Sequence, residues 1–176
     1  MSDELPQSPA TVDRARSFGA VAEAYDRGRP AYPDEAVAWL TGGEAKVVLE
    51  LGAGTGKLTR ELVDQGHAVF ATEPDEAMLA ILRERVPEVS AKVATAEEIP
   101  ANDRSVDVVV VAQAFHWFDH EVALAEIARV LKPGGHVALV WNSRDEQTTS
   151  SPDEPSQDGP VVSDGTDTDM LLIDFR

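Results

Sequence analysis

Residues 47–56 join an apolar run directly to three glycines that alternate with other residues. The run 47–51 is interrupted only by Glu50, which is typical of a strand covered on both faces. The glycines that follow are Gly52, Gly54 and Gly56. Glycine at every second position lets the backbone approach a large polar ligand, and a helix expected over 57–65 directs its free N–H groups to the same place. The segment therefore predicts a ligand-binding turn in a doubly wound α/β domain.

The glycine spacing argues against two common phosphate-binding motifs. A dinucleotide fingerprint that begins at Gly52 needs a small residue at position 57, where this chain has Lys57. A P-loop that ends in Gly56-Lys57 needs glycine at position 51 and serine or threonine at position 58. These positions hold Leu51 and Leu58, so both phosphate interpretations fail on specific residues.

An acidic residue follows the second expected strand, residues 68–72. Glu73 lies about 20 residues beyond the first glycine, where a carboxylate can accept hydrogen bonds from both ribose hydroxyls of an adenosine. A helix expected over 74–86 begins beside it, so Glu73 could instead be a charge that the helix dipole favours. The upstream turn favours ribose binding.

The fourth expected strand, residues 106–112, is rich in β-branched residues and opens into an aromatic loop. The loop reads Gln-Ala-Phe-His-Trp-Phe-Asp over 113–119. Ligands of open α/β sheets lie beyond the carboxyl ends of the strands, so this loop is predicted to form a pocket wall. A helix over 119–131, capped by Asp119, a Lys-Pro-Gly-Gly turn and a strand over 137–141 should follow.

With E-x-G-x-G-x-G at 50–56, the aromatic loop and the Leu-Lys-Pro-Gly-Gly turn at 131–135, the chain resembles the Rossmann-like S-adenosylmethionine-dependent methyltransferases. More narrowly, it resembles the methyltransferase type 11 domain. The resemblance covers roughly residues 17–145. It implies an α/β fold with a doubly wound, mostly parallel sheet, and S-adenosyl-L-methionine as the cofactor.

The resemblance also implies which residues bind the cofactor. The cofactor is expected to contact the glycine turn, the end of the second strand, the loop after the third strand and the end of the fourth strand. An N-terminal segment is expected to cover it as a lid. The implied set is Glu50, Gly52, Ala53, Gly54, Gly56, Glu73, Pro74, Ala96, Glu97, Gln113, Tyr25 and Arg29. Two alternatives stay open: Arg29 as surface charge, and Tyr25 as a core residue with a solvated hydroxyl.

Composition restricts the partners. The 176 residues contain no cysteine and no apolar run long enough to span a bilayer, and the net charge is −17. This charge argues against a nucleic-acid backbone or an anionic lipid as partner, although it does not exclude either. We expect a cytoplasmic protein that acts on a small-molecule methyl acceptor, with its oligomeric state open.

The C-terminal segment differs sharply in composition from the rest. Residues 143–176 hold 9 acidic and 2 basic side chains and have no apolar periodicity before Met170. We expect three parts: a flexible segment over 1–16, the methyltransferase domain over 17–145 and an acidic disordered tail over 146–176. Relatives continue with a helix and two strands, so the sequence predicts five strands, with the last two missing by truncation or a frameshift.

The expected activity is methyl transfer, with His116 as the candidate general base near the end of the fourth strand. The alternative for His116, which stays open, is that it lines the pocket or bonds to the backbone. His116 and His120 resemble an inverted zinc-protease motif, but the intervening acid is Asp119 and no third ligand is evident, so no metal is predicted.

Two alternatives to a methyltransferase stay open: an inactive S-adenosylmethionine-binding protein, and a nicotinamide-dependent oxidoreductase, which Lys57 makes less favourable.

Overall fold

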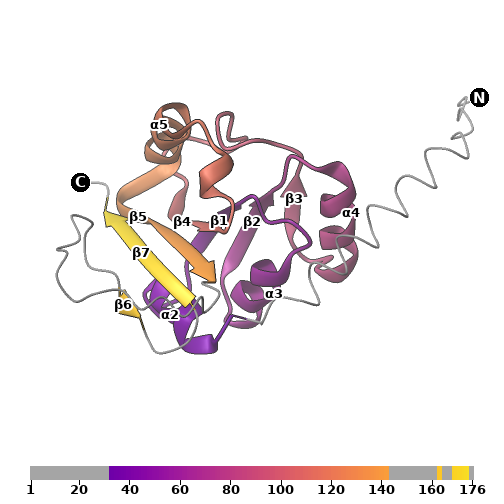
Figure 1. Ribbon diagram of the computed structural model, residues 1–176, viewed down its shortest axis with the longest axis horizontal. Helices are drawn as coiled ribbons and strands as arrows, with labels where there is room; N and C mark the ends of the chain where they lie inside the picture. The colour runs from indigo at the N-terminus through magenta and orange to yellow at the C-terminus, as the bar shows by residue number, and fades with distance from the viewer. Residues whose placement is uncertain (1–31, 143–161, 164–167, 175–176) are drawn as a thin grey trace, which may run out of the picture.

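The apolar runs of the sequence pair into one seven-stranded sheet (Figure 1). The computed structural model describes residues 32–142, 162–163 and 168–174. The strand order is β3-β2-β1-β4-β5-β7-β6. The strands are β1 Val47–Leu51, β2 Ala68–Thr72, β3 Ser90–Lys92, β4 Val106–Ala112, β5 Leu131–Asn142, β6 Val162–Ser163 and β7 Thr168–Asp174. The helices are α2 Asp34–Thr41, α3 Lys57–Asp64, α4 Glu76–Arg85, α5 His120–Val130 and the 3₁₀ turn η1 Phe115–Trp117.

The five strands β1 to β5 are parallel, and the central pair β1 and β4 is covered on both faces. Val48 pairs with Val108 and Leu49 with Val109, and all four side chains are fully buried. A β-branched strand with helices on both sides is excluded from solvent because each face of the sheet packs against an apolar helix surface. The predicted doubly wound, mostly parallel α/β fold is confirmed.

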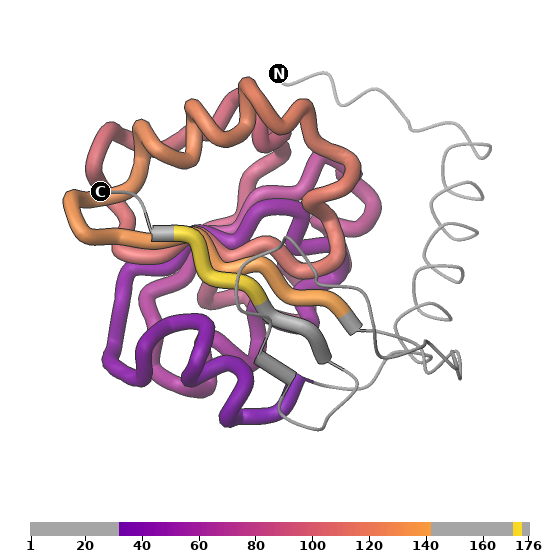
Figure 2. The backbone as a smooth tube through the Cα atoms, turned by 60° about the vertical axis from the view of Figure 1, so that its left-hand side comes forward, coloured from indigo at the N-terminus to yellow at the C-terminus, as the bar shows by residue number. Residues whose placement is uncertain are grey.

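Two helix layers enclose the sheet (Figure 2). On one face, Val48, Val108 and Val110 pack with buried side chains of α2 and α3. Helix α4 lies on the same face, because it packs on Ala71, the register partner of Glu50. Helix α5 covers the opposite face, where its buried residues are Ala123, Ile127 and Val130.

The predicted strands 47–51, 68–72 and 106–112 are confirmed, while the predicted helices are each one to three residues too long. The helix expected over 74–86 is α4, Glu76–Arg85, because the Asp75 carboxylate accepts the N–H groups of Ala77 and Met78. Asp119 caps α5 as predicted, through the N–H of Val122. The helices expected over 57–65 and 119–131 are α3 and α5, with ends at Asp64 and Val130.

Strand β5 is longer than the predicted 137–141. It begins at Leu131, which pairs with Val106, and the regular ladder resumes at His136 opposite Val108 after a register shift. The Lys-Pro-Gly-Gly turn lies in that irregular stretch, with Gly134 at a φ of +82°. The turn thus ends the helix as predicted, but the chain joins the sheet beside β4 already at Leu131.

The prediction that the last two strands are missing is wrong. Strand β7 pairs antiparallel with β5 over seven residue pairs from His136–Asp174 to Asn142–Thr168, and β6 pairs with β7. Residues 162–163 and 168–174 of the predicted disordered tail are therefore strands, and β7 covers the edge of β5. Composition misled the prediction because one short apolar run, Met170-Leu171-Leu172-Ile173, suffices when a long partner strand is available. The remaining tail and residues 1–16 lie outside the described residues, and the domain boundaries stay a prediction.

In the described part of the chain, no helix combines the length and the hydrophobicity that crossing a bilayer requires.

We predict that Ile173→Ala lowers the free energy of unfolding more than Leu172→Ala does. Ile173 is half-buried against the α5-side core, whereas Leu172 is 37 % exposed and points to the other face. Truncating a half-buried isoleucine should cost about 1–2 kcal/mol, and the leucine less than about half of that. Urea denaturation of both variants measures the difference. Equal costs would contradict the role of β7 as a packed strand.

Candidate functional site

The carboxyl ends of the parallel strands gather four loops at one edge of the sheet. These loops are residues 52–56 after β1, 73–75 after β2, 93–102 after β3 and 113–119 after β4. In open α/β sheets, this edge is where ligands bind. We call it the carboxyl edge.

The glycine turn after β1 has the backbone shape that its sequence predicts. Gly52, Gly54 and Gly56 have φ angles of +69°, +56° and +84°, in the left-handed region that favours glycine. The Ala53 N–H donates to the Thr72 carbonyl at 3.0 Å, which fixes the turn to the end of β2. Helix α3 begins immediately after Gly56, so its first N–H groups lie at this edge.

Two of these glycines also allow close contacts. A Cβ on Gly52 would lie 2.5 Å from the Cβ of Ala114, and one on Gly56 would lie 2.8 Å from Cγ of Leu82. Among the described residues, a Cβ on Gly54 would meet nothing within 4 Å. Gly52 therefore allows the loop after β1 to contact the loop after β4. Gly56 allows the start of α3 to pack against α4. Beside Gly54, the described part of the chain leaves the space open.

Glu73 connects the glycine turn to the start of α4. Its Oε2 accepts the Gly54 N–H at 2.9 Å and its Oε1 accepts the Asp75 N–H at 2.9 Å, and the residue is 7 % exposed. Asp75 caps α4, and Glu73 accepts the N–H of this capping residue, so a favourable charge at the start of α4 remains an alternative to ribose binding. Each carboxylate oxygen keeps capacity for a further donor such as a ribose hydroxyl. Pro74 lies exposed between the two acids.

Glu50 lies beneath the turn and is 1 % exposed. The Thr59 hydroxyl on α3 donates to its Oε2 at 2.6 Å. The pKa of Glu50 is raised to about 8, mainly by burial: the Thr59 hydrogen bond opposes this rise, and the charge of the nearby Glu73 adds to it. The carboxyl group therefore links β1 to the first turns of α3. The sequence interpretation missed Thr59, although its place nine residues after Glu50 on the following helix was a usable signal.

The loop after β3 contributes Ala96 and Glu97. Ala96 is buried in the core on the α5 side, so its backbone is the part that a ligand at the edge could contact. Glu97 is half-buried and accepts the Asp119 N–H at 2.8 Å. Burial acts to raise the pKa of Glu97, but hydrogen bonds from Asp119, its own N–H and the Thr95 hydroxyl lower it below the usual glutamate value.

Gln113, directly after β4, has a strained backbone and a side-chain donor that needs a partner. Its φ is +62°, and its N–H donates to the Val140 carbonyl at 2.9 Å. Within the described residues, its buried Nε2 has no hydrogen-bond acceptor. A buried unpaired amide is costly, so this atom is a natural partner for an acceptor group of a ligand.

His116 and Trp117 lie at the outer rim of the carboxyl edge. Both are exposed, Trp117 at 81 %, and their ring centroids are 4.7 Å apart. His120, in contrast, stacks on Phe115 and its Nε2 lies 3.1 Å from the Phe115 carbonyl oxygen. Across the described ranges, no group of three or more His, Cys, Asp or Glu side chains could hold a metal ion. Tyr25 and Arg29 lie outside the described residues.

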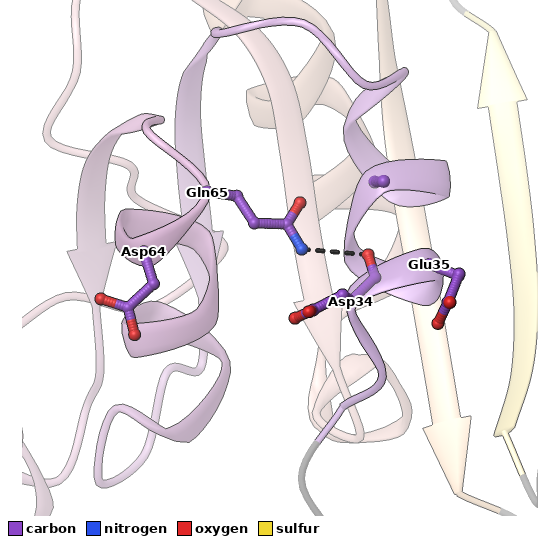
Figure 3. A pocket seen from close by; sticks show the side chains of 5 residues that line it. Asp34, Glu35, Asp64 and Gln65 are labelled. Carbon is purple, nitrogen blue, oxygen red and sulfur yellow. Dashed lines mark hydrogen bonds between the residues drawn. The ribbon is translucent and has the colours of Figure 1, made fainter.

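A shallow hollow of about 460 Å³ lies elsewhere, between α2 and α3 (Figure 3). Its lining residues are Asp34, Glu35, Ala38, Asp64 and Gln65. The Gln65 Nε2 donates to the Asp34 carbonyl at 3.0 Å across it. Because it adjoins the C-terminal end of α3, it lies at the opposite end of that helix from the glycine turn. It is not part of the carboxyl-edge site.

The chain is similar to known methyltransferases in sequence and in fold. The profile of a family described as "Methyltransferase domain" matches residues 49–139, just over half of the chain. An uncharacterized methyltransferase of Mycobacterium bovis is 55 % identical over 135 residues, which cover 77 % of this chain and 56 % of that protein. An uncharacterized methyltransferase of Schizosaccharomyces pombe is 44 % identical over 135 residues, with coverages of 74 % and 54 %.

A solved structure shares the fold. The structure of an S-adenosylmethionine-dependent methyltransferase from Aquifex aeolicus is 26 % identical and superposes with a TM-score of 0.59, covering 69 % of this chain and 70 % of that one. The chain spans little more than half the length of the curated relatives that it matches.

We predict that Gly52→Ala destabilises the protein more than Gly54→Ala. Both place a side chain at positive φ, which costs about 1–2 kcal/mol. Only the Gly52 variant also forces a Cβ to within 2.5 Å of Ala114, so it should lose about 1–3 kcal/mol more. Chemical denaturation of the two variants tests this. If they are equally stable, the β1 and β4 loops are not in contact.

We predict that Glu50→Gln changes how stability depends on pH. Between the two pKa values, Glu50 is protonated in the folded protein and ionised in the unfolded chain. Its contribution is fully present below the ordinary pKa of 4.5 and is lost as pH rises towards about 8. Relative to wild type, the stability of the glutamine variant should therefore increase from about pH 4.5 to about pH 8, by on the order of a few kcal/mol, and the difference should be constant above that range. Denaturation curves across this range measure it, and parallel pH profiles would refute the protonated state of Glu50.

Proposed function

The chain belongs to the methyltransferase domain family, and from this premise we propose that it binds S-adenosyl-L-methionine at the carboxyl edge and methylates a small-molecule acceptor. The observation that carries the proposal is the Glu73 carboxylate, which is buried, fixed by two backbone N–H groups and adjacent to an open glycine turn.

The residues at this edge fit the chemical groups of the cofactor. Glu73 can accept hydrogen bonds from the ribose hydroxyls. The left-handed turn at Gly54 leaves room for close approach of the ligand to the backbone, and the N–H groups at the start of α3 suit its carboxylate. The unpaired Nε2 of Gln113 offers one more donor at the end of β4. We include Glu50 as support beneath the turn, and the backbone near Ala96 and Glu97 as the neighbouring wall.

When bound, S-adenosylmethionine supplies a methyl group that its sulfonium already activates. The protein then has to hold an acceptor in line and exclude water, which are effects of proximity and orientation. His116 is our candidate to take the proton from an acceptor that carries one, because its exposed imidazole lies on the rim beside Trp117. Trp117 offers an exposed aromatic face for the acceptor or for a cationic group.

The charge of the chain favours a small acceptor over a nucleic acid. The net charge is −17, and a polyanion would meet strong repulsion at physiological ionic strength. A second candidate function is cofactor binding without methyl transfer. It rests on the observation that the cofactor-side carboxylate Glu73 is buried and fixed, whereas the candidate base His116 is exposed at the rim.

We predict that S-adenosylhomocysteine binds the purified chain with a Kd of about 1–100 μM, whereas NADH does not bind measurably. Glu73→Ala should weaken this binding at least about tenfold, because it removes the ribose acceptor and releases the Gly54 N–H. Glu76→Ala is the matched control, since Glu76 is an exposed acid three residues away in the first turn of α4. Isothermal titration calorimetry measures wild type with S-adenosylhomocysteine, wild type with NADH, and each of the two variants with S-adenosylhomocysteine.

Three results would count against the proposal. Binding of NADH alone would favour an oxidoreductase, and a folded wild-type chain that binds neither ligand would rule out the cofactor site. Equal losses in the Glu73 and Glu76 variants would show a general charge effect rather than a ribose contact. If the cofactor binds but no small molecule in an acceptor screen is methylated, the second candidate function gains support.

A further inference from the structure

Arg129, in the last turn of α5, has an unusually complete set of hydrogen bonds. Its Nε and Nη2 donate to the two carboxylate oxygens of Glu126 at 2.7 and 2.8 Å. Its Nη2 also donates to the Ile99 carbonyl at 2.9 Å, and its Nη1 to the Ala101 carbonyl at 2.9 Å and to Asp103 Oδ1 at 2.8 Å. A guanidinium has five N–H donors, so none is left over. Three of these five bonds reach residues 99–103.

Glu126 holds the same segment from its other side. Its Oε2 accepts the Ile99 N–H at 2.9 Å, so the Glu126–Arg129 pair binds both the N–H and the carbonyl of one loop residue. The hydrogen bonds from the Arg129 guanidinium lower the pKa of Glu126. Burial acts in the opposite direction, and the Ile99 N–H lowers the pKa further. Two adjacent backbone groups of a loop are thus fixed by one ion pair on a helix.

The beginning of this segment is fixed to the beginning of the same helix. Glu97 accepts the N–H of Asp119, the residue that caps α5. Residues 97–103 therefore run alongside α5 in the same direction, attached near its start by Glu97 and near its end by Arg129. The side chains of Ala96 and Ile99 are buried in the core between α5 and the sheet, in the cluster that includes Leu51 at the end of β1.

The segment begins where a nucleoside would have to pass. β3 is the neighbour of β2, and the Glu73 N–H donates to the Lys92 carbonyl at 3.2 Å, so the loop after β3 leaves the sheet beside Glu73. Through Glu97 and Asp119, this loop reaches the loop after β4. The two loops together border the space above β1 and β2 on the α5 side. A base attached to a ribose at Glu73 would have to lie near the backbone of residues 95–97 if it extended to that side, because the loop after β3 starts beside Glu73.

We propose that Arg129 and Glu126 are positioning residues for nucleoside binding: they hold the 97–103 segment on α5 and so keep the backbone at Ala96 and Glu97 in place as a wall of the nucleoside pocket. This inference rests on the proposed function and adds residues that contact no ligand themselves. Their position at the far end of α5 separates them from the cofactor groups named above.

The chain contains a matched control in Arg60. Its side chain is 37 % exposed, against 32 % for Arg129, and it is likewise bound to acids and to a carbonyl. Its Nη1 lies 2.7 Å from Glu88 Oε1 and 3.7 Å from Asp64 Oδ1, and its Nη2 donates to the Arg85 carbonyl. These contacts join α3 to the end of α4 and do not involve the 97–103 segment. Loss of Arg60 therefore reports the general effect of removing an arginine network.

The test compares Arg129→Lys and Arg60→Lys. Lysine keeps the positive charge but cannot reproduce the planar fork of donors. In Arg129→Lys, we expect the Kd of S-adenosylhomocysteine and of adenosine to rise about three- to tenfold, and amide hydrogen exchange at Ile99 to accelerate in the ligand-free protein. In Arg60→Lys, we expect both Kd values within about twofold of wild type and unchanged exchange in residues 97–103. Glu126→Gln, which keeps the side-chain shape, should act in the direction of Arg129→Lys.

The outcomes separate this inference from the proposed function. If wild type binds S-adenosylhomocysteine and Arg129→Lys binds it equally well, only the positioning role is overturned. If both lysine variants weaken binding equally, the effect is a general loss of stability and the positioning role is again overturned. If folded wild type binds neither ligand, the proposed function fails and the inference fails with it. A selective loss in Arg129→Lys and Glu126→Gln, together with faster exchange at Ile99, supports it.

Discussion

The hydrogen bond from the Gly54 N–H to the Glu73 carboxylate is the contact on which the carboxyl edge depends. It joins the turn after β1 to the turn after β2, and the second oxygen of Glu73 extends the link to Asp75 and so to the cap of α4. A buried carboxylate is stable only when donors surround it. The left-handed backbone at Gly54 presents such a donor, so the glycine pattern and the acid that follows β2 depend on each other.

Around this contact, the rest of the edge is arranged by helices on both faces of the sheet. Helix α3 reaches the turn through Thr59 and Glu50, and helix α5 holds the loops after β3 and β4 through both of its ends. The loops therefore owe their shape to side chains on regular elements, which is how a rigid scaffold can position loop groups for binding. Gln113 completes the edge with a strained backbone and an unpaired amide.

The sequence predicted the parts of the structure that depend on local pattern. The strands at 47–51, 68–72 and 106–112 and the cap at Asp119 follow from apolar runs and from one acid before a helix, and the structure has them. Pairings between distant segments were not predictable in this way. Nothing near Arg129 in the chain indicates that it binds Ile99, and nothing near Leu171 indicates that β7 lies against β5. An acidic composition outweighed one short apolar run, although the long edge of β5 offered it a partner. The roles of the proposed cofactor residues stay predictions.

The position of β7 has a consequence for how the molecule opens. Its sheet neighbours are β5 on one side and the two-residue β6 on the other, so β6 and β7 are joined to the rest of the sheet through a single ladder. Local opening of that ladder leaves the five parallel strands and all four loops of the carboxyl edge paired as before. Opening at this ladder, together with loss of the Leu171 and Ile173 contacts to the core, would therefore expose the amides of β7 at a lower free energy than those of the central strands β1 and β4.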